Sequence, residues 1–364
     1  MPVRPLALTL TLLATFGAAF AQNPPAAADP LAGIRSRSDL TDQDRQAIQA
    51  FIAQQVAAIA TGDAAQGSEG VRALRAGYEG SEAFRRVYAA ATLDAIQPAI
   101  RKAEPLAAAR LLTVANALNV PEAVPLLLEA LADERVGVRA AALTGLVRLR
   151  ETVARAGAET YARVLDALRT VGARETSRDT LRTLYHALDY SGVGGAPDPR
   201  RNATALLELL EARARLYAAG DVPAFGADDS GLRLAGVLGK SLDDAERKRL
   251  TAAVASMLKF ALERYVQGPR KLADVRDTHP NRRLIEERDA AERLILMGEE
   301  RLVALLAPSE VPQVASNLRR LELINVKNEW RKWVALIQAA TGVDFSLAEP
   351  PEPEPGATTR PTRR

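Results

Sequence analysis

The chain lacks cysteine altogether and carries only two histidines, His186 and His279. Without cysteine it has no disulfide, no lipid anchor on an N-terminal cysteine, no cysteine-ligated zinc and no covalently attached haem. A metal site built on paired histidines needs both in one place, and these two belong to different helical regions. We therefore expect no metal, no cofactor and no catalytic constellation.

An excess of charge of one sign is also lacking. The 48 basic residues face 45 acidic residues, which leaves a formal net charge of +3. Arginine-rich segments such as Arg247-Lys248-Arg249 are interleaved with acids, a pattern typical of a solvated helix face with ion pairs one turn apart. Because nucleic-acid binding requires an uncompensated basic stripe, the composition predicts no nucleic-acid partner.

Long hydrophobic runs are confined to the N-terminus, where Arg4 precedes an apolar segment from Leu6 to Phe20. The alternative of a membrane anchor is disfavoured, because the segment is short for a bilayer and contains several threonines. Ala19 and Ala21 provide the small residues that signal peptidase requires for cleavage after Ala21. We expect a periplasmic or secreted protein with no membrane insertion after cleavage.

The rest of the chain divides by composition. A Pro/Ala-rich stretch at 22–38 is expected to be a disordered linker, and the proline-rich end at 346–364 a disordered tail. Between them, apolar residues recur at helical spacing and Gly or Pro marks the ends of segments. We assign helical repeats to 39–220 and a helical C-terminal region or cap to 221–345.

Helix starts are expected where a Thr or Ser precedes an acid by three residues, as in a capping box. Three such pairs stand before apolar periodic segments, namely Thr41 with Asp44, Thr176 with Asp179, and Ser241 with Asp244. In the C-terminal region we expect helices at 243–267, 281–297, 299–307 and 309–323, followed by a last helix that holds Trp330 and Trp333. These two aromatic residues are expected to cover the final apolar face, with stacking on a ligand as the alternative.

The clearest motif runs from Pro121 to Leu149. Two short apolar helices, at 121–132 and from Val136 onward, are joined by a turn that contains Asp133. A weaker copy precedes it: Ala109-Arg110 lies about 30 residues before Val138-Arg139, a period within the range of helical repeats.

This motif resembles the HEAT-repeat family, in its short bacterial form, through Asp133 and the pair Val138-Arg139. The resemblance implies an all-α solenoid of helical hairpins, with an irregular helical C-terminal half. It also implies that Asp133 and Arg139 make structural hydrogen bonds between neighbouring repeats. A HEAT-type family of di-iron hydroxylases uses repeated His-Glu pairs, which His186-Ala187 and His279-Pro280 do not supply.

The function expected from this architecture is that of an exported, non-enzymatic scaffold. It would bind a protein or peptide partner on the concave face that the second helices of the repeats line. Polar positions opposite the apolar side of those helices are the candidate contacts, namely Asn116, Arg148, Arg182 and His186. Arginine suits such a surface because its planar fork makes several hydrogen bonds at once.

The alternative is an enzyme or a chaperone-like lyase with an unrecognised cleft, which we would expect around 190–200 or 221–231. The segment from Gly236 to Ser241 looks like a phosphate-binding loop. However, its glycine spacing does not fit and no strand precedes it, so nucleotide binding is not expected.

Overall fold

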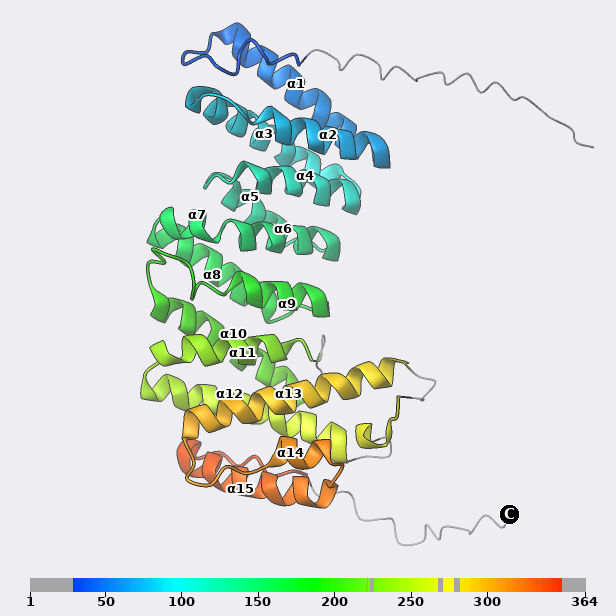
Figure 1. The fold of residues 1–364 in the computed structure, drawn as a ribbon, viewed down its shortest axis with the longest axis vertical. Coiled ribbons are helices and arrows are strands. Elements are labelled where there is room, and N and C mark those ends of the chain that lie inside the picture. The colour runs from blue at the N-terminus through cyan, green and yellow to red at the C-terminus, as the bar shows by residue number, and fades with distance from the viewer. Residues whose placement is uncertain (1–28, 221, 223–225, 268–270, 278–281, 349–364) are drawn as a thin grey trace, which may run out of the picture.

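The computed structural model describes residues 29–220, 222, 226–267, 271–277 and 282–348. Within these ranges every regular element is a helix and no strand is present, which confirms the expected all-α class (Figure 1). The expected signal peptide at 1–21, the linker residues 22–28, the tail from 349 and His279 lie outside the described residues.

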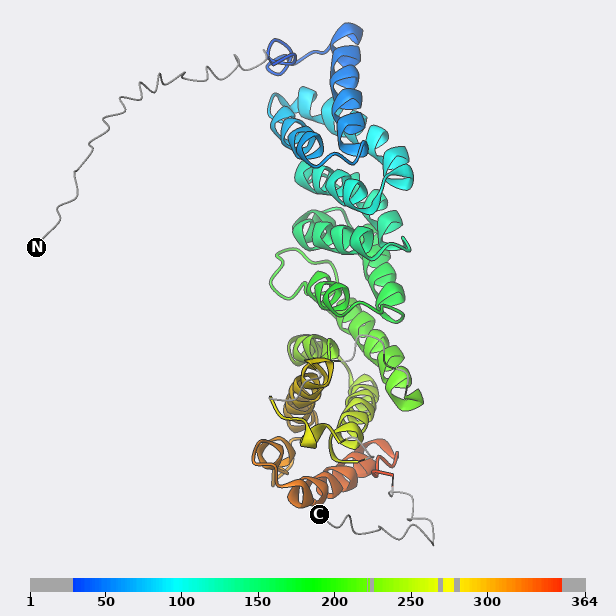
Figure 2. The same cartoon turned by 90° about the vertical axis from the view of Figure 1, so that its right-hand side faces the viewer.

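The helices stack in two layers along the long axis of the molecule, and Figure 2 shows the two layers side by side. The first-helix layer comprises α1 (Asp42–Ala60), α3 (Glu82–Lys102), α5 (Ala123–Leu131), α8 (Ala158–Gly172), α10 (Pro199–Ala219), α12 (Asp244–Val266) and α15 (Leu323–Thr341). The second-helix layer comprises α2 (Ala64–Gly77), α4 (Pro105–Leu118), α6 (Val136–Arg148), α9 (Arg178–Ala187), α11 (Asp228–Leu238), α13 (Arg282–Leu306) and α14 (Val314–Arg319). Each helix contacts the next in its own layer and its partner in the other. The short α7 (Arg150–Arg155) connects α6 to α8.

Local sequence explains where several of these helices begin and end. Thr41 and Asp44 form the expected capping box of α1, with each side chain bonded to the other residue's backbone N–H. Pro199 occupies the first turn of α10, where its missing N–H costs nothing. That helix ends at Gly220, whose φ of 74° is readily adopted by glycine.

Glycines let successive helices of the second-helix layer approach closely. A β-carbon at Gly67 of α2 would overlap Arg110 of α4, and one at Gly231 of α11 would overlap Tyr185 of α9. The same small-against-large pairing brings Gly145 of α6 against α4 and Gly236 of α11 against α13. The layer is therefore packed by shape as well as by burial of apolar surface.

The C-terminal region differs from expectation at Gly298. The sequence predicts a break there, with helices at 281–297 and 299–307, but α13 continues without interruption from Arg282 to Leu306. Gly298 is buried, and Leu258 of α12 fills the space that a side chain at 298 would need. The glycine thus serves close helix packing rather than helix termination. Of the helix expected at 309–323, only α14 forms.

Two expected caps are displaced by one or two residues. Ser177, not Thr176, caps α9, while the Thr176 amide donates to the buried carboxylate of Glu175. Asp243, not Ser241, caps α12 in a capping box with Glu246, because extended backbone at Leu242 separates the cap from the short helix η1 (Gly239–Ser241).

Both ends of the described chain are tied to the stack. In the segment expected to be a linker, residues 30–36 form turns and Leu31 is fully buried. The indoles of Trp330 and Trp333 are also buried, and they donate to the Phe345 carbonyl and to Glu299 Oε1 at 3.1 and 3.0 Å. None of the helices in the described ranges combines the length and apolar composition needed to cross a bilayer.

Candidate functional site

Arg139 connects three parts of the stack. Its Nη1 donates to the carbonyls of Asp133 and Glu134, at 3.0 and 2.8 Å, in the turn before its own helix. Its Nε and Nη2 donate to the carboxylate of Glu175 at 2.8 and 2.9 Å, in the connection between α8 and α9. The guanidinium therefore holds neighbouring helix pairs in register.

Asp133 makes a different set of contacts. Its carboxylate accepts from the Arg135 guanidinium at 2.7 and 2.8 Å, and these bonds lower the pKa of Asp133. Arg135 in turn donates to the carbonyls of Ala103 and Ile100 at the end of α3. Val138, the third motif residue, is fully buried in α6.

The sequence alone did not predict two residues of this hydrogen-bond network, Arg135 and Glu175. Arg135 lies in the predicted turn after residue 132, and its sequence position does not indicate that it carries the link to α3. Glu175 lies far downstream of the motif, and no pattern near it marks it as the partner of Arg139. The two residues share one sequence feature, because each is a charged residue in a connection between apolar helices.

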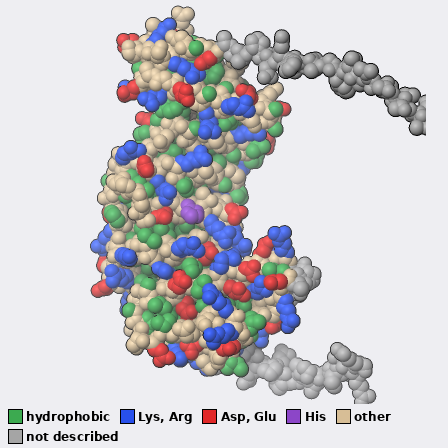
Figure 3. All heavy atoms as spheres, in the orientation of Figure 1, with side chains coloured by type: hydrophobic (Ala, Val, Ile, Leu, Met, Phe, Trp, Pro, Cys, Tyr) green, Lys and Arg blue, Asp and Glu red, His purple; other side chains and the backbone are tan. Residues whose placement is uncertain are grey.

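The second-helix layer presents most of the expected contact residues. Arg148 on α6 and His186 on α9 are exposed, and Arg182 on α9 is half-buried, with Asp179 4.0 Å from its guanidinium. Helices α6 and α9 pack directly against each other. Figure 3 shows basic and acidic side chains interspersed over the face of the molecule on which this layer lies.

Asn116 is placed differently from expectation, because it is buried between α4 and α6 and does not point outward. Its Nδ2 donates to the Ala141 carbonyl at 3.4 Å, and its Oδ1 has no hydrogen-bond partner. The side chain is enclosed because Gly145 leaves room for it on the facing helix. Helical periodicity alone could not distinguish this buried polar position from an exposed one.

A buried polar cluster lies where α9, α10 and α11 meet. Arg213 donates to both carboxylate oxygens of Asp228 at 3.0 Å, and the hydroxyls of Tyr185 and Tyr217 donate to the same carboxylate at 2.6 and 2.8 Å. The charged pair is fully buried, and burial raises the pKa of both tyrosines well above the usual value. With its hydrogen-bonding capacity used internally and no solvent access, the cluster is structural.

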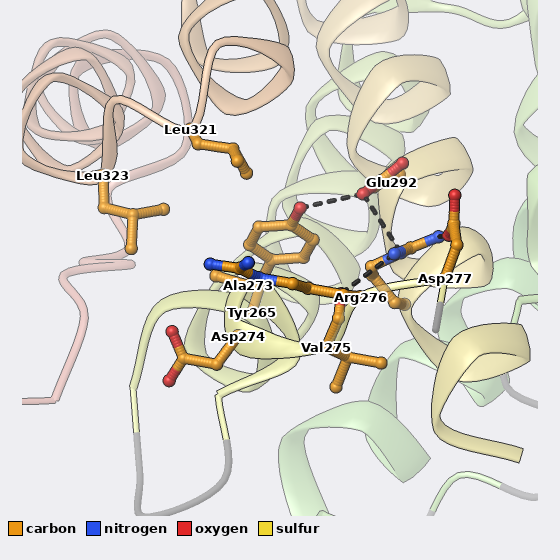
Figure 4. A pocket seen from close by; sticks show the side chains of 10 residues that line it. Tyr265, Ala273, Asp274, Val275, Arg276, Asp277, Glu292, Leu321 and Leu323 are labelled. Atoms are coloured by element: carbon orange, nitrogen blue, oxygen red, sulfur yellow. Dashed lines mark hydrogen bonds and ion pairs between the residues drawn. The ribbon is translucent and has the colours of Figure 1, made fainter. Parts of the chain in front are cut away.

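An open cavity of about 600 Å³ lies near the C-terminal end of the stack (Figure 4). Its walls come from the end of α12, the short helix η2 (Leu272–Asp274) with the segment after it, the N-terminal half of α13, and the connection from α14 to the start of α15. This volume is in the range of small-ligand pockets. The cavity lies outside both places, 190–200 and 221–231, where a cleft was expected.

The cavity combines paired charges with apolar surface. Tyr265 donates to Glu292 Oε1 at 2.8 Å, and Arg288 is held by Asp277, Asp289 and the Val275 carbonyl. Burial and this bond to Glu292 raise the pKa of Tyr265.

Two residues of the cavity are less constrained by partners. Arg276 is exposed and pairs with no described carboxylate, so it is available to a ligand. Leu321 is 62% exposed and has a φ of 58°, which is a strained conformation for a leucine.

Neither the surface residues nor the cavity forms a recognisable catalytic set. Within the described part of the chain, no group of His, Asp and Glu is arranged to hold a metal ion. No protein-family model matches the chain, and no curated protein is significantly similar to it. A functional assignment therefore depends on the geometry of the stack and on the chemistry of the surfaces just described.

Proposed function

We propose that the protein is a HEAT-like α-solenoid scaffold that binds a protein or peptide partner along its second-helix layer. The observation that carries this proposal is the continuity of the layer. Helices α2, α4, α6, α9, α11 and α13 each contact the next, so their outward sides form one extended surface. Extended surfaces of this kind suit an extended partner, which helical-repeat proteins typically bind.

Exposed side chains in the middle of this layer support the proposal. Arg148 and His186 make no side-chain ion pair with any described residue, and they lie on adjacent helices. An arginine without a carboxylate partner can bind a carboxylate or backbone carbonyls of a partner without first breaking an internal bond. The interspersed charges nearby favour a partner of mixed rather than strongly acidic character.

The proposal includes export. If the segment before Gln22 is a cleaved signal peptide, the partner belongs to the periplasm or to the medium outside the cell.

The cavity around Tyr265 and Glu292 supports a second candidate, an enzyme or chaperone-like lyase. Its volume suits a small molecule, and the strained Leu321 at its rim is the kind of feature that clusters at functional sites.

The decisive experiment is affinity capture from a cell-envelope extract with protein that begins at Gln22, followed by variants. Arg148→Glu with His186→Glu changes the second-helix layer. Arg163→Glu with Arg215→Glu is the matched control, because both arginines are exposed on the first-helix layer and neither forms an ion pair with a described residue. We expect the first pair to abolish capture of a specific partner and the second to leave it intact.

Equal loss from both pairs, with the helical circular dichroism unchanged, would contradict the assignment of the surface. Capture of no partner, together with turnover of a small molecule that Arg276→Ala abolishes, would instead establish the second candidate.

A further inference from the structure

Three cationic side chains from three elements converge on a second cavity, of about 260 Å³, between α11, η1, α12 and α13. Lys240 comes from η1, Arg247 from the first turns of α12, and Arg301 from the C-terminal half of α13. Leu250 and Leu305 provide apolar wall beside them. Among the residues that the structure describes, none with an acidic side chain lines this cavity.

The charge of this cluster is not balanced within the described part of the protein. Neither Lys240 nor Arg247 makes an ion pair with a described residue. The nearest carboxylate to Arg301 is that of Glu300, 3.9 Å from Nη2 and half exposed to solvent. Elsewhere the arginines are commonly held at close range, as Arg139 and Arg213 are. Lys240 and Arg247 are exposed, so water screens part of the repulsion among the three cations, and a bound anion would relieve the rest.

Arg301 is held in the cavity wall with part of its hydrogen-bonding capacity unused. Its Nε is buried and has no hydrogen-bond partner. Its guanidinium lies against Gly236 of α11, so that a β-carbon at position 236 would overlap Nη1. The glycine thus creates the space in which the guanidinium sits at the cavity. A buried donor without a partner is costly, and a bound anion beside the guanidinium would lessen that cost through its charge.

From these observations we propose that the cavity binds a phosphate group, either as free phosphate or as the phosphate of a small organic monoester. Three cationic side chains and the single carboxylate of Glu300 leave a net charge of about two positive units at the cavity. This charge matches a phosphate monoester, which carries about two negative charges near neutral pH. The two arginine forks suit the several acceptor oxygens of phosphate. The leucine wall provides a contact surface for the carbon part of an ester.

The site does not depend on a phosphate-binding loop. Gly236 lies within α11, and Gly239 and Lys240 lie in η1, with no strand before them in the described chain. Backbone amides of a glycine-rich loop therefore do not surround the anion, and side chains carry the binding. This separates the proposal from nucleotide binding by the motif that the sequence suggests.

The test measures the melting temperature and the binding isotherm of the protein that begins at Gln22. Inorganic phosphate, phenyl phosphate and acetate are compared at constant ionic strength. We expect both phosphates to bind and to raise the melting temperature more than acetate does, because a ligand that binds only the folded state stabilises it. Tighter binding of phenyl phosphate would identify an ester as the preferred source, and equal binding would identify free phosphate.

Variants locate the site. Lys240→Gln and Arg247→Gln should each weaken phosphate binding by about tenfold or more, the loss expected for one bond to a charged group. Gly236→Ala should also weaken it, because the new β-carbon displaces Arg301 while every charge is retained. Arg233→Gln is the control, since Arg233 is exposed on the same helix α11 and lies outside the cavity.

The proposal fails if phosphate stabilises the wild type no more than acetate does. It also fails if Arg233→Gln weakens binding as much as the cavity variants do. These outcomes are independent of partner capture on the second-helix layer.

Discussion

Asn116 of α4 occupies the space that a side chain at Gly145 of α6 would fill. A β-carbon built on Gly145 would overlap the carboxamide of Asn116. The Nδ2 of Asn116 donates to the carbonyl of Ala141, which lies one turn before Gly145 on α6. A side chain at position 145 would therefore displace Asn116, and the reason lies on a neighbouring helix rather than in the backbone conformation of α6. The contact fixes how closely α4 and α6 approach.

We expect Gly145→Ala to destabilise the protein by about 1–3 kcal/mol, the usual cost of overpacking a buried contact. Gly137→Ala, on the same helix, is the matched control, because no atom lies near the added methyl group. Since alanine favours the helix, the control should be neutral or stabilising by up to about 1 kcal/mol. Urea denaturation monitored by circular dichroism measures both, and equal effects would show that the helices are not this close.

Leu146 and Arg148 test which side of α6 faces the interior. Leu146 is fully buried, whereas Arg148 is exposed. Leu146→Ala should cost about 2–5 kcal/mol through lost burial and the cavity left behind. Arg148→Ala should change stability by less than about 0.5 kcal/mol. Similar midpoints for the two variants in urea would contradict this orientation of the helix.

Asp228 should be among the most sensitive positions in the chain. Asp228→Asn leaves the fully buried Arg213 without its counter-charge, which typically costs about 3–5 kcal/mol. Glu82→Gln is the control, because it removes an exposed pair with Arg86 one turn away, worth about 0.3–0.5 kcal/mol. Thermal melts at neutral pH compare the two. A control variant as unstable as Asp228→Asn would mean that burial does not set the cost.

Glu175 should make stability depend on acidic pH. Burial alone would raise the pKa of this carboxyl, but hydrogen bonds from Arg139 and from the Thr176 and Ser177 amides outweigh it and lower the pKa below the ordinary 4.5. The folded state then binds its proton less readily than the unfolded state does. The stabilisation is therefore present above pH 4.5 and is lost as the pH falls through the lowered pKa.

Glu175→Gln should accordingly reduce stability at neutral pH by about 1–3 kcal/mol, as for lost bonds to a charged group. The difference from the wild type should narrow as the pH falls below 4.5. Urea titrations at several pH values measure this difference. Glu134→Gln, at an exposed and unpaired position, should show a small difference at every pH. A constant gap for Glu175→Gln would contradict the linkage.

The proposal that the protein is exported makes a prediction that is independent of the fold. Protein recovered from the periplasm or the medium should begin at Gln22, because Ala19 and Ala21 satisfy the small-residue rule of signal peptidase. N-terminal sequencing or intact-mass measurement checks this. Recovery of the chain in a membrane fraction with Met1 to Ala21 still attached would contradict it.

The sequence predicted those parts of the fold that depend on local chemistry. Helical periodicity, the capping box at Thr41 and the end of α10 at Gly220 are encoded within a few residues of where they act. Gly298 shows the limit of prediction from local sequence. Whether a glycine ends a helix or admits a neighbour depends on Leu258, which lies on another helix. Asn116 is also buried because of a neighbouring helix, since Gly145, which leaves room for its side chain, lies on the next helix of the layer.

The two cavities could not be predicted for a related reason. The wall around Tyr265 includes Leu321 from a distant segment, and Arg301 lines the same cavity as Lys240 because α13 packs beside α11. Neither set has a spacing that a motif could capture. In the sequence, the charged residues look like an ordinary solvated helix face. The packing of the helices decides which of them find an ion-pair partner among the described residues.

The buried Arg213–Asp228 pair also affects how the stack comes apart. A linear array in which helix pairs contact mainly their neighbours can unfold one segment at a time. This pair, with Tyr185 and Tyr217, lies where α8 and α9 meet α10 and α11, so separating the two halves would expose two buried charges and two hydroxyls together. The bond from Tyr185 of α9 to Asp228 of α11 crosses this boundary. We therefore expect the cluster to couple the unfolding of the helix pairs on its two sides.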